Sequence, residues 1–578
     1  MKFYWKYVKP HIRYFILGPI LMLTEIVGEV AMPYLFSLII NEGIKGGKGT
    51  GYIITVGVGM ILFATFMMFG AIGGSYFNTK AAVSFAADLR KDSFAKVQEY
   101  SFANIDAFTT GSLVTRLTND ITQLQNTVRM GLVMLLRSPG MLIGGLFMAI
   151  RMNKQLALIV AAVIPLIIIL QVFIIKVGFP RFGIMQKKID ALNNTVEEGL
   201  TNVRVIKSFV RNDVEKKKFN DANADLKNSS INAFKIVIYA SPVMTMLMNF
   251  TTLAVVWFGG KQIIAGDMPV GDLTAFTTYI IQILMSLMML AMVILSGSRA
   301  LASARRIHEV LDAKVDLTNE PDADASLEVK EGKIEFKNVS FKYYKNREEK
   351  VLYDISFTAE PASTVGIIGS TGSGKSSMVQ LIPRLYDADE GEVLVDGVNV
   401  KKYTLENLRK GVGMVLQKNV LFSGTIRENL EWGDENASFE EVKNAASAAQ
   451  ANDFVESFTK GYETELGQGG VNVSGGQKQR LCIARALLKK PKILILDDST
   501  SAVDTATEAR IRESFKTDLK DTTKLIIAQR ISSVINADKI IVVDEGKIVG
   551  MGTHDELMKS CEEYREIYSS QMDKEVTA

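Results

Sequence analysis

Apolar residues are distributed unevenly along this chain. Long uncharged runs dominate up to about residue 299, whereas from about residue 329 onward charged and apolar residues mix as in a soluble α/β domain. A helix needs about 20 largely apolar residues to cross the hydrocarbon core of a membrane. Six segments meet this requirement, at residues 14–40, 51–79, 131–150, 156–175, 236–260 and 273–298. The pattern predicts a membrane all-α domain over residues 1–315, a linker over 316–330 and an α/β domain over 331–578.

The connections between the six segments predict how the chain lies in the membrane. Three connections are short and two, at residues 80–130 and 176–235, are long and rich in lysine and arginine. Basic loops stay on the cytoplasmic side, so we expect a multi-pass protein of the cytoplasmic membrane with its second domain in the cytoplasm. Helical spacing within the long loops predicts that the spans continue beyond the membrane. Segments near 108–117 and 202–211 cap these extensions and contact another domain, or are ordinary solvated surface.

Composition excludes some other classes. The net charge of +3 is small for 578 residues and gives no support for nucleic-acid binding. The two cysteines, Cys482 and Cys561, both lie in the second domain, so a disulfide framework is not indicated.

The second domain contains a phosphate-binding motif. Residues 369–376 match G-x-x-x-x-G-K-[ST] at every defined position, between a strand-like run at 364–368 and an apolar helical pattern. The backbone of such a loop cradles phosphates, the lysine reaches the β- and γ-phosphates, and the hydroxyl after it holds Mg²⁺. The predicted ATP-binding residues here are Gly369, Ser370, Thr371, Gly372, Ser373, Gly374, Lys375, Ser376 and Ser377.

A second carboxylate-bearing strand completes this pattern. The four apolar residues 493–496 are typical of a buried parallel strand, and Asp497 at their carboxyl end is placed to hold Mg²⁺ through water. Between the two motifs, residues 472–480 read NVSGGQKQR, which resembles the signature of ATP-binding-cassette (ABC) proteins. With six spans preceding one cassette, the chain resembles an ABC transporter of the exporter type over nearly its whole length. The resemblance implies an α/β P-loop nucleotide-binding domain that uses ATP and Mg²⁺.

The resemblance also implies roles for further residues. Tyr343 resembles the aromatic residue that stacks on adenine, although it could be a core tyrosine and Tyr344 is an alternative. Gln417 resembles the glutamine that contacts Mg²⁺ and relays the nucleotide state to the spans, and Asp504 lies in a segment similar to the D-loop. In the family two cassettes bind ATP head to tail, so this chain's signature would contact the ATP of a partner cassette through Ser474, Gly475, Gly476 and Gln477.

Two catalytic positions depart from the family pattern. Asp498 stands where the general-base glutamate is usual, and Gln529 stands where a histidine usually contacts the γ-phosphate. Both changes fall in one ATP pocket while the signature is complete. The simpler interpretation is a heterodimer in which a second half-transporter supplies the glutamate and the histidine; the alternative is a slow homodimer in which Asp498 serves as an adequate base.

The transported compound is harder to predict. Glu25 and Glu29 lie on one face of the first span, where they could attract cationic amphiphiles or pair with Arg137 of the third span. Flexible thioethers and aromatic rings in the sixth span suit a promiscuous cavity, although ordinary packing explains them equally well. These candidates are Phe276, Tyr279, Met285 and Met289. We expect ATP-driven export of amphiphilic drugs or lipid-like compounds across the cytoplasmic membrane by alternating access, with hydrophobic or cationic small molecules and membrane lipids as partners. The alternatives are a dedicated lipid or peptide exporter or flippase, and an ATP-gated channel or regulatory subunit.

Overall fold

The computed structural model describes residues 3–343, 349–498 and 503–576. It divides into two compact units. The helical unit comprises Met1–Gln98 and Gly111–Asp312, and the α/β unit comprises Glu99–Thr110 and Ala313–Ala578. The α/β unit therefore includes twelve residues from the first long loop, which a single boundary near residue 315 does not anticipate.

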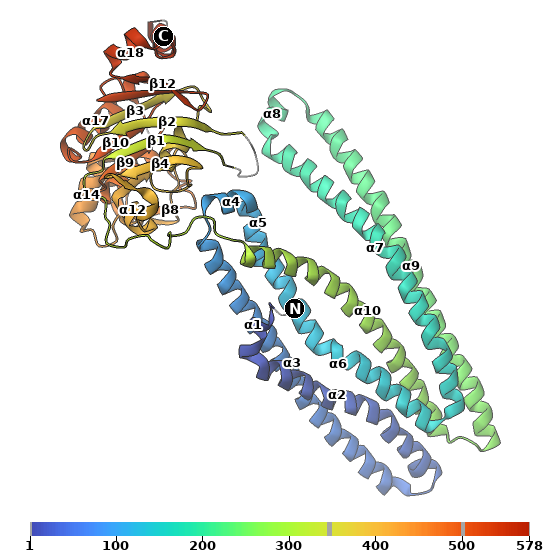
Figure 1. The fold of residues 1–578 in the computed structure, drawn as a ribbon. Helices are drawn as coiled ribbons and strands as arrows, with labels where there is room; N and C mark the ends of the chain where they lie inside the picture. The colour runs from blue at the N-terminus through green and yellow to red at the C-terminus, as the bar shows by residue number, and fades with distance from the viewer. Residues whose placement is uncertain (1–2, 344–348, 499–502, 577–578) are drawn as a thin grey trace. The chain divides into compact units, whose positions relative to one another are not determined.

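Six long helices build the helical unit (Figure 1). In the described part of the chain, six helices are long and apolar enough to cross a membrane, which confirms the six predicted spans. They are α2 (Ile12–Leu38), α3 (Gly49–Gln98), α6 (Ile121–Met152), α7 (Lys154–Thr201), α9 (Asn212–Ala265) and α10 (Val270–Asp312), preceded by the short α1 (Trp5–Val8).

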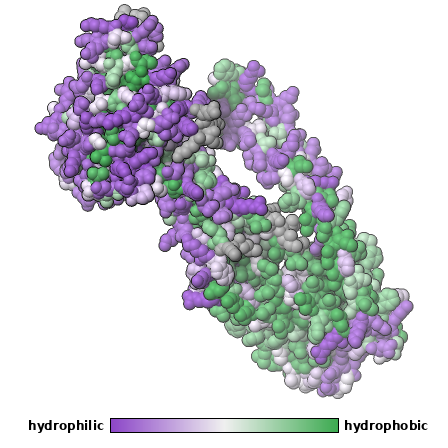
Figure 2. All heavy atoms as spheres, in the orientation of Figure 1, coloured by the Kyte–Doolittle hydropathy of each residue, from purple (hydrophilic) through white to green (hydrophobic). Residues whose placement is uncertain are grey.

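These helices are longer than a membrane is thick. Helix α9 has 54 residues, which at about 1.5 Å per residue is roughly 80 Å, against a hydrocarbon core of about 30 Å. Figure 2 shows hydrophobic residues gathered in a band over part of the helical unit, with hydrophilic residues beyond it. The prediction that the spans continue as helices past the membrane is confirmed.

Helices α7 and α9 form a long hairpin with α8 (Val203–Ser208) at its tip (Figure 1). The Phe182 and Phe234 rings lie 5.6 Å apart across the hairpin. At the tip Val205, Phe209 and Val210 are 55, 73 and 81% exposed. The segment predicted near 202–211 is thus a short helix that presents apolar side chains to its surroundings.

The tip of the first long loop begins earlier than predicted. Helix α4 (Phe102–Phe108) starts after Ser101, whose side chain accepts a hydrogen bond from the Asn104 backbone while the Asn104 side chain accepts one from the Ser101 backbone. This reciprocal cap uses asparagine where glutamate or glutamine is usual, so the sequence pattern did not mark it. The stretch predicted at 108–117 instead contains α5 (Thr110–Thr115) and the turn before it.

The α/β unit has two main sheets and a two-stranded sheet of β7 (Gly424–Thr425) and β8 (Glu465–Leu466). The larger has the strand order β12-β11-β3-β10-β9-β6, in which all neighbours are parallel except β11 and β12. Its strands are β3 (Thr364–Gly369), β6 (Val412–Val415), β9 (Ile493–Asp497), β10 (Thr523–Ile527), β11 (Lys539–Asp544) and β12 (Lys547–Gly552). The smaller, antiparallel sheet has the order β2-β1-β4-β5, formed by β1 (Ile334–Phe341), β2 (Leu352–Ala359), β4 (Glu390–Val395) and β5 (Val398–Asn399).

Alternation along β9 shows why the parallel sheet is buried on both faces. Ile493 and Ile495 belong to the core cluster shared with β3 and the smaller sheet. Leu494 and Leu496 belong to the cluster shared with α16 (Gly475–Leu488). A strand covered on both sides has no polar face, which accounts for the uninterrupted apolar run. Further helices include α11 (Lys375–Gln380), α14 (Phe439–Ala448), α17 (Thr505–Asp518), α18 (His554–Ser560) and α19 (Glu562–Val576).

Candidate ATP-binding site

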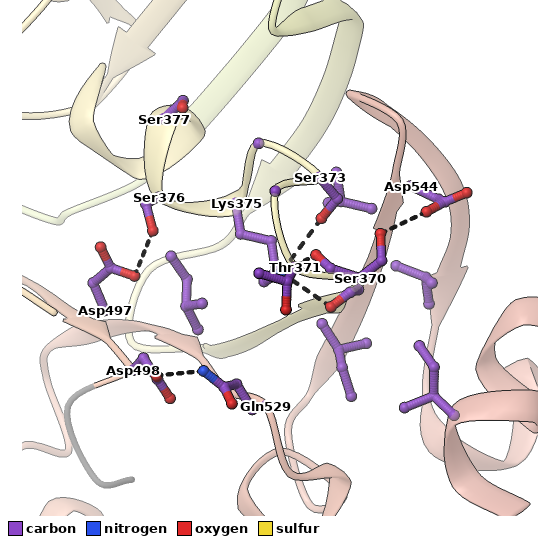
Figure 3. Close-up of a pocket in the computed structure, with 18 of the residues that line it drawn as sticks. Ser370, Thr371, Ser373, Lys375, Ser376, Ser377, Asp497, Asp498, Gln529 and Asp544 are labelled. Atoms are coloured by element: carbon purple, nitrogen blue, oxygen red, sulfur yellow. Dashed lines mark hydrogen bonds between the residues drawn. The ribbon is translucent and has the colours of Figure 1, made fainter. Parts of the chain in front are cut away.

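The strand order of the larger sheet brings the predicted nucleotide residues together. Strands β3, β10, β9 and β6 are consecutive neighbours and parallel, so their carboxyl ends meet at one edge. Ligands of open α/β sheets bind at this edge. A pocket of about 740 Å³ opens there, lined by the phosphate loop, Gln417, Asp497, Asp498 and Gln529 (Figure 3).

The phosphate loop has the backbone that its glycines allow. Gly372 and Gly374 have φ angles of 83° and 97°, in the left-handed region, and Gly374 directly precedes α11. The Lys375 ammonium donates to the carbonyl oxygens of Gly369 at 3.0 Å and Ser370 at 2.6 Å. Burial lowers the pKa of Lys375, while the Asp497 and Asp498 carboxylates oppose this shift. The loop thus holds a cation beside the start of a helix, an arrangement suited to a polyphosphate.

The residues predicted to hold Mg²⁺ also meet. The hydroxyl of Ser376 donates to Oδ1 of Asp497 at 2.8 Å, and the Asp497 side chain is only 2% exposed. Burial raises the pKa of Asp497, and the neighbouring Asp498 charge adds to this rise. A hydroxyl and a buried carboxylate are hard oxygen donors that fit Mg²⁺; Gln417 lines the same pocket.

The two altered catalytic positions contact each other. The Gln529 side-chain amide donates to Oδ2 of Asp498 at 2.7 Å (Figure 3). Burial raises the pKa of Asp498, opposed by the hydrogen bond from Gln529 and the charges of Lys375 and Arg530. Asp498 has a φ of 49°, a left-handed conformation that aspartate adopts more readily than most side chains. Its carbonyl oxygen accepts from Gln479 of α16 at 3.3 Å.

Tyr343 lines the pocket and also packs against the core. Its hydroxyl lies 2.8 Å from the Ser377 hydroxyl, and its ring stands nearly perpendicular to Tyr386, with centroids 5.1 Å apart. Tyr386 in turn donates to Oδ2 of Asp106 in α4 at 2.9 Å. Tyr343 therefore packs in the core and also lines the pocket, so neither of its two predicted roles excludes the other. The alternative residue, Tyr344, lies outside the described residues.

The signature residues lie away from this pocket. Ser474 caps α16, with its hydroxyl accepting from the Gln477 backbone at 3.3 Å and its own backbone donating to the Gln477 side chain at 2.9 Å. Ser474 and Gly475 are exposed, while Gly476 and Gln477 are partly buried, and none of the four lines the pocket. Asp504 caps α17 by accepting from the Thr507 backbone at 2.9 Å; the D-loop residues 501 and 502 lie outside the described part.

Comparison with known proteins identifies the family. The "ABC transporter transmembrane region" pattern matches residues 15–287, and the "ABC transporter" pattern matches residues 352–501. An uncharacterized ABC transporter ATP-binding protein of Bacillus subtilis, YfiB, is 39% identical over 573 residues, 98% of each chain. The chain belongs to the ABC transporter family.

Other relatives of this ABC transporter refine its type. The putative multidrug export ATP-binding/permease protein YgaD of B. subtilis is 33% identical, covering 99% of both chains. The ATP-dependent lipid A-core flippase of Desulfotalea psychrophila is 34% identical, covering 89% of both. The structure of a bacterial Atm1-family ABC exporter with ATP bound matches with a TM-score of 0.76 at 26% identity, covering 98% of both chains. The chain thus has the exporter fold, and its ABC domain couples ATP hydrolysis to transport.

One contact of the transporter's pocket had no signal in the sequence. Gln571 of α19 donates to the carbonyl oxygen of Gln529 at 2.7 Å, and its side-chain oxygen accepts from the Ile531 backbone at 2.8 Å. The two bonds hold the loop after β10 on both sides of Arg530. Glu563, Glu566 and Ile567 of the same helix also line the pocket. A lone glutamine in a polar helix belongs to no motif, so only the fold reveals this role.

The intramembrane carboxylates of the transporter are paired. Arg137 lies 2.8 Å from Oε1 of Glu25 and 2.6 Å from Oε1 of Glu29, so the structure favours the pairing alternative over free carboxylates. Phe276 and Tyr279 are fully buried, and the Tyr279 hydroxyl donates to the Val30 carbonyl at 2.7 Å. In this structure the two rings pack between helices, and their place in a substrate cavity stays a prediction. Met285 is exposed and Met289 partly exposed.

Proposed function

We propose that this chain is the degenerate-site half of a heterodimeric ABC exporter for amphiphilic drugs or lipid-like compounds. The observation that supports this most directly is the contact between Asp498 and Gln529, beside an intact pairing of Ser376 with Asp497. The pocket retains the groups that hold a nucleotide, while the general base and the group that contacts the γ-phosphate are both changed.

The altered groups are poorly suited to catalysis. Asp498 has a side chain one methylene shorter than glutamate, and a misplacement of about 1 Å can cost roughly 10²-fold in rate. Gln529 cannot become cationic, and losing one stabilising contact to a transition-state oxygen costs about 2.7 to 4 kcal/mol. The hydrogen bond between the two side chains also occupies one oxygen of the carboxylate that would accept the proton of water. ATP would bind here and turn over slowly.

The signature half is built for a different nucleotide. Ser474 and Gly475 are exposed at the amino end of α16, where free backbone N–H groups favour an anion. In a dimer this end would complete a pocket whose catalytic glutamate and histidine come from the second half-transporter. That pocket would hydrolyse ATP faster than the pocket built on this chain's own phosphate loop.

Transport would follow from the difference between the two pockets. ATP drives a conformational change only through its greater affinity for one state, and moving a population from 1:99 to 99:1 needs about 5.5 kcal/mol of such preference. Nucleotide retained at Lys375 would keep the cassettes together, and hydrolysis in the partner-derived pocket would reset the spans from outward-facing to inward-facing. When bound, Mg²⁺ would neutralise charge on the phosphates.

The substrate class rests on the relatives. One is described as a putative multidrug export protein and another as a lipid A-core flippase, which supports drug-like or lipid-like cargo for this chain. The pairing of Glu25 and Glu29 with Arg137 leaves one net negative charge in this cluster, which weakens the argument for cationic substrates in particular. A dedicated lipid or peptide exporter is the second candidate; stimulation of ATPase activity by lipids alone, without any drug response, would favour it.

Mixing purified half-transporters tests the proposal. This chain alone in lipid nanodiscs is expected to show at most a few per cent of the ATPase activity of the mixture with its partner. After turnover, a photoreactive ATP analogue should label this chain's Lys375 pocket more than the partner's. Full activity from this polypeptide alone, or equal labelling of the two chains, would contradict the division of roles.

A further inference from the structure

Two cations of the helical unit lie close to one partly exposed aromatic ring, that of Tyr14. The Arg13 guanidinium carbon lies 4.8 Å and the Lys80 ammonium 4.9 Å from the centre of the Tyr14 ring. The Lys80 ammonium also lies 5.7 Å from the centre of the Tyr76 ring. Tyr14 is held in place by stacking on Phe77, with centroids 5.9 Å apart.

The position of this pair along the chain places it at a membrane boundary. Lys80 is the first charged residue after the uncharged run at residues 52–79 of α3, and Arg13 immediately precedes the uncharged run at 14–24 of α2. The Lys80 end leads into the first long, basic loop, which is expected on the cytoplasmic side, and Arg13 lies at the same end because both cations are near Tyr14. Arg13, Lys80 and the two tyrosines thus lie where the apolar part of the spans gives way to the cytoplasmic headgroup region.

Nearby carboxylates are engaged by other groups. Asp88 lies 2.8 Å from the His11 ring, and Asp92 accepts from Lys6 at 2.6 Å and Tyr7 at 3.2 Å. In the described part of the helical unit, no ion pair joins Arg13 or Lys80 to a carboxylate. Both cations thus lie near the same ring without a carboxylate partner among the described residues, and a bound anion would be attracted to both.

An apolar groove leads from the cations into the span. Its lining follows one side of α3 and consists of Ala71, Ile72, Ser75, Tyr76, Thr79, Lys80 and Val83. Ile72 and Tyr76 are largely exposed. From Lys80 to Ala71 the helix rises about 13 Å, so the groove runs from the basic end well into the hydrocarbon depth.

We propose that this groove binds an anionic phospholipid of the cytoplasmic leaflet. Its headgroup phosphate lies between Arg13 and Lys80, next to the Tyr14 ring, and one acyl chain follows the groove past Tyr76 to Ile72. Charge complementarity selects the anion, and the adjoining apolar groove selects a lipid over free phosphate. The site joins α2 to α3 at their cytoplasmic ends, beyond the transport and ATP functions discussed above.

Quenching of a single tryptophan tests this site in the full-length transporter. Ile72→Trp, in a background with phenylalanine at Trp5, Trp257 and Trp432, reports which lipid occupies the groove in vesicles. Brominated phosphatidylglycerol is expected to displace brominated phosphatidylcholine with a relative binding constant of about five or more. Arg13→Gln with Lys80→Gln should reduce this ratio to near one, whereas Arg13→Lys with Lys80→Arg should retain it.

A matched control removes equal charge at the cytoplasmic end of another span. Lys176→Gln with Arg181→Gln, in α7, should leave the ratio at Ile72→Trp unchanged. An equal ratio for both lipids in the parent reporter, or a loss of preference in the α7 control, would overturn the site. So would displacement of phosphatidylglycerol by inorganic phosphate alone, or quenching by neither lipid, which would show that protein covers this face.

Discussion

The side-chain amide of Gln529 donates a hydrogen bond of 2.7 Å to the carboxylate of Asp498, so the two departures from the usual ABC pattern form one contact. Residues in contact rarely contribute independently to a free energy. Glutamate and histidine at these positions would make a different contact, with a longer acid and a base that can carry a proton. We therefore expect substitutions at positions 498 and 529 to have non-additive effects on the ATPase rate.

Restoring both residues should restore hydrolysis. Asp498→Glu with Gln529→His is expected to raise the ATPase rate of this chain alone by roughly 10²-fold. Glutamate extends the carboxylate by one methylene, and histidine can carry a positive charge near the γ-phosphate. Steady-state phosphate release measures this. Each single variant should recover less than a tenth of the gain, and Asp498→Asn with Gln529→His serves as the inactive control. Additive gains from the single variants would contradict the coupling.

Binding of Mg-ATP should release protons under mildly acidic conditions. Burial raises the pKa of Asp497 and of Asp498, so the empty pocket keeps protons at a higher pH than a free aspartate does, while Mg²⁺ binds the ionised form. Affinity should therefore rise with pH up to the raised pKa and then level off. Calorimetry at about pH 5 and about pH 7.5, in buffers of different ionisation enthalpy, measures the released protons.

The same shifts have a definite sign for stability. When an acid has a higher pKa in the folded than in the unfolded state, the folded state binds more protons, and its stability falls as pH rises through that interval. The nucleotide-free ABC domain should thus lose stability on this account as pH increases above the ordinary aspartate value, and Mg²⁺ should reverse the loss. Asp497→Asn should remove the larger part of this pH dependence of stability. An unchanged pH profile would show that Asp497 is not its source.

Arg137 should matter more to stability than either of its partners. Arg137→Gln leaves Glu25 and Glu29 facing each other without a cation, and breaking a buried ion pair by removing one partner costs about 3 to 5 kcal/mol. Because the three side chains retain some exposure, we expect the lower end of this range. Thermal unfolding in detergent should show the triple variant Glu25→Gln, Glu29→Gln, Arg137→Gln to be more stable than Arg137→Gln alone. The reverse order would show that the charges do not stabilise each other.

Removing Gln571 should loosen the loop after β10, which carries Gln529. Gln571→Ala deletes the bonds to the Gln529 carbonyl and the Ile531 backbone, and each such bond contributes about 0.5 to 1.5 kcal/mol. Because the two bonds together contribute about 1 to 3 kcal/mol, a fluorescent ATP analogue is expected to dissociate from this pocket at least about 5-fold faster. Gln571→Glu keeps the acceptor for Ile531 and should give an intermediate rate, while Ser569→Ala on the same helix should match the parent. An unchanged rate in Gln571→Ala would exclude the role.

The features predicted correctly from sequence are those in which adjacent residues carry the information. Uncharged runs identify the spans because a bilayer imposes a length and an apolar composition, and the phosphate loop is local because one turn forms it. The contacts of Gln571 and the pairing of Tyr386 with Asp106 depend on strands and helices far apart in the chain, so no local pattern reveals them. The pairing of Arg137 with Glu25 and Glu29 is only partly predictable from sequence. Ionisable groups inside a bilayer usually pair with one another, but sequence spacing alone does not show whether the carboxylates bind Arg137 or a substrate.

The contact made by helix α4 has a consequence for folding during synthesis. Its Asp106 contacts Tyr386, 280 residues later in the chain, and ribosomes add about 5 to 20 residues per second. The helix therefore leaves the ribosome roughly 15 to 55 s before Tyr386, whose ring also lies 6.1 Å from that of Phe102 in the folded chain. A slower ribosome lengthens this interval, during which Asp106 lacks the hydroxyl that it accepts from in the folded chain.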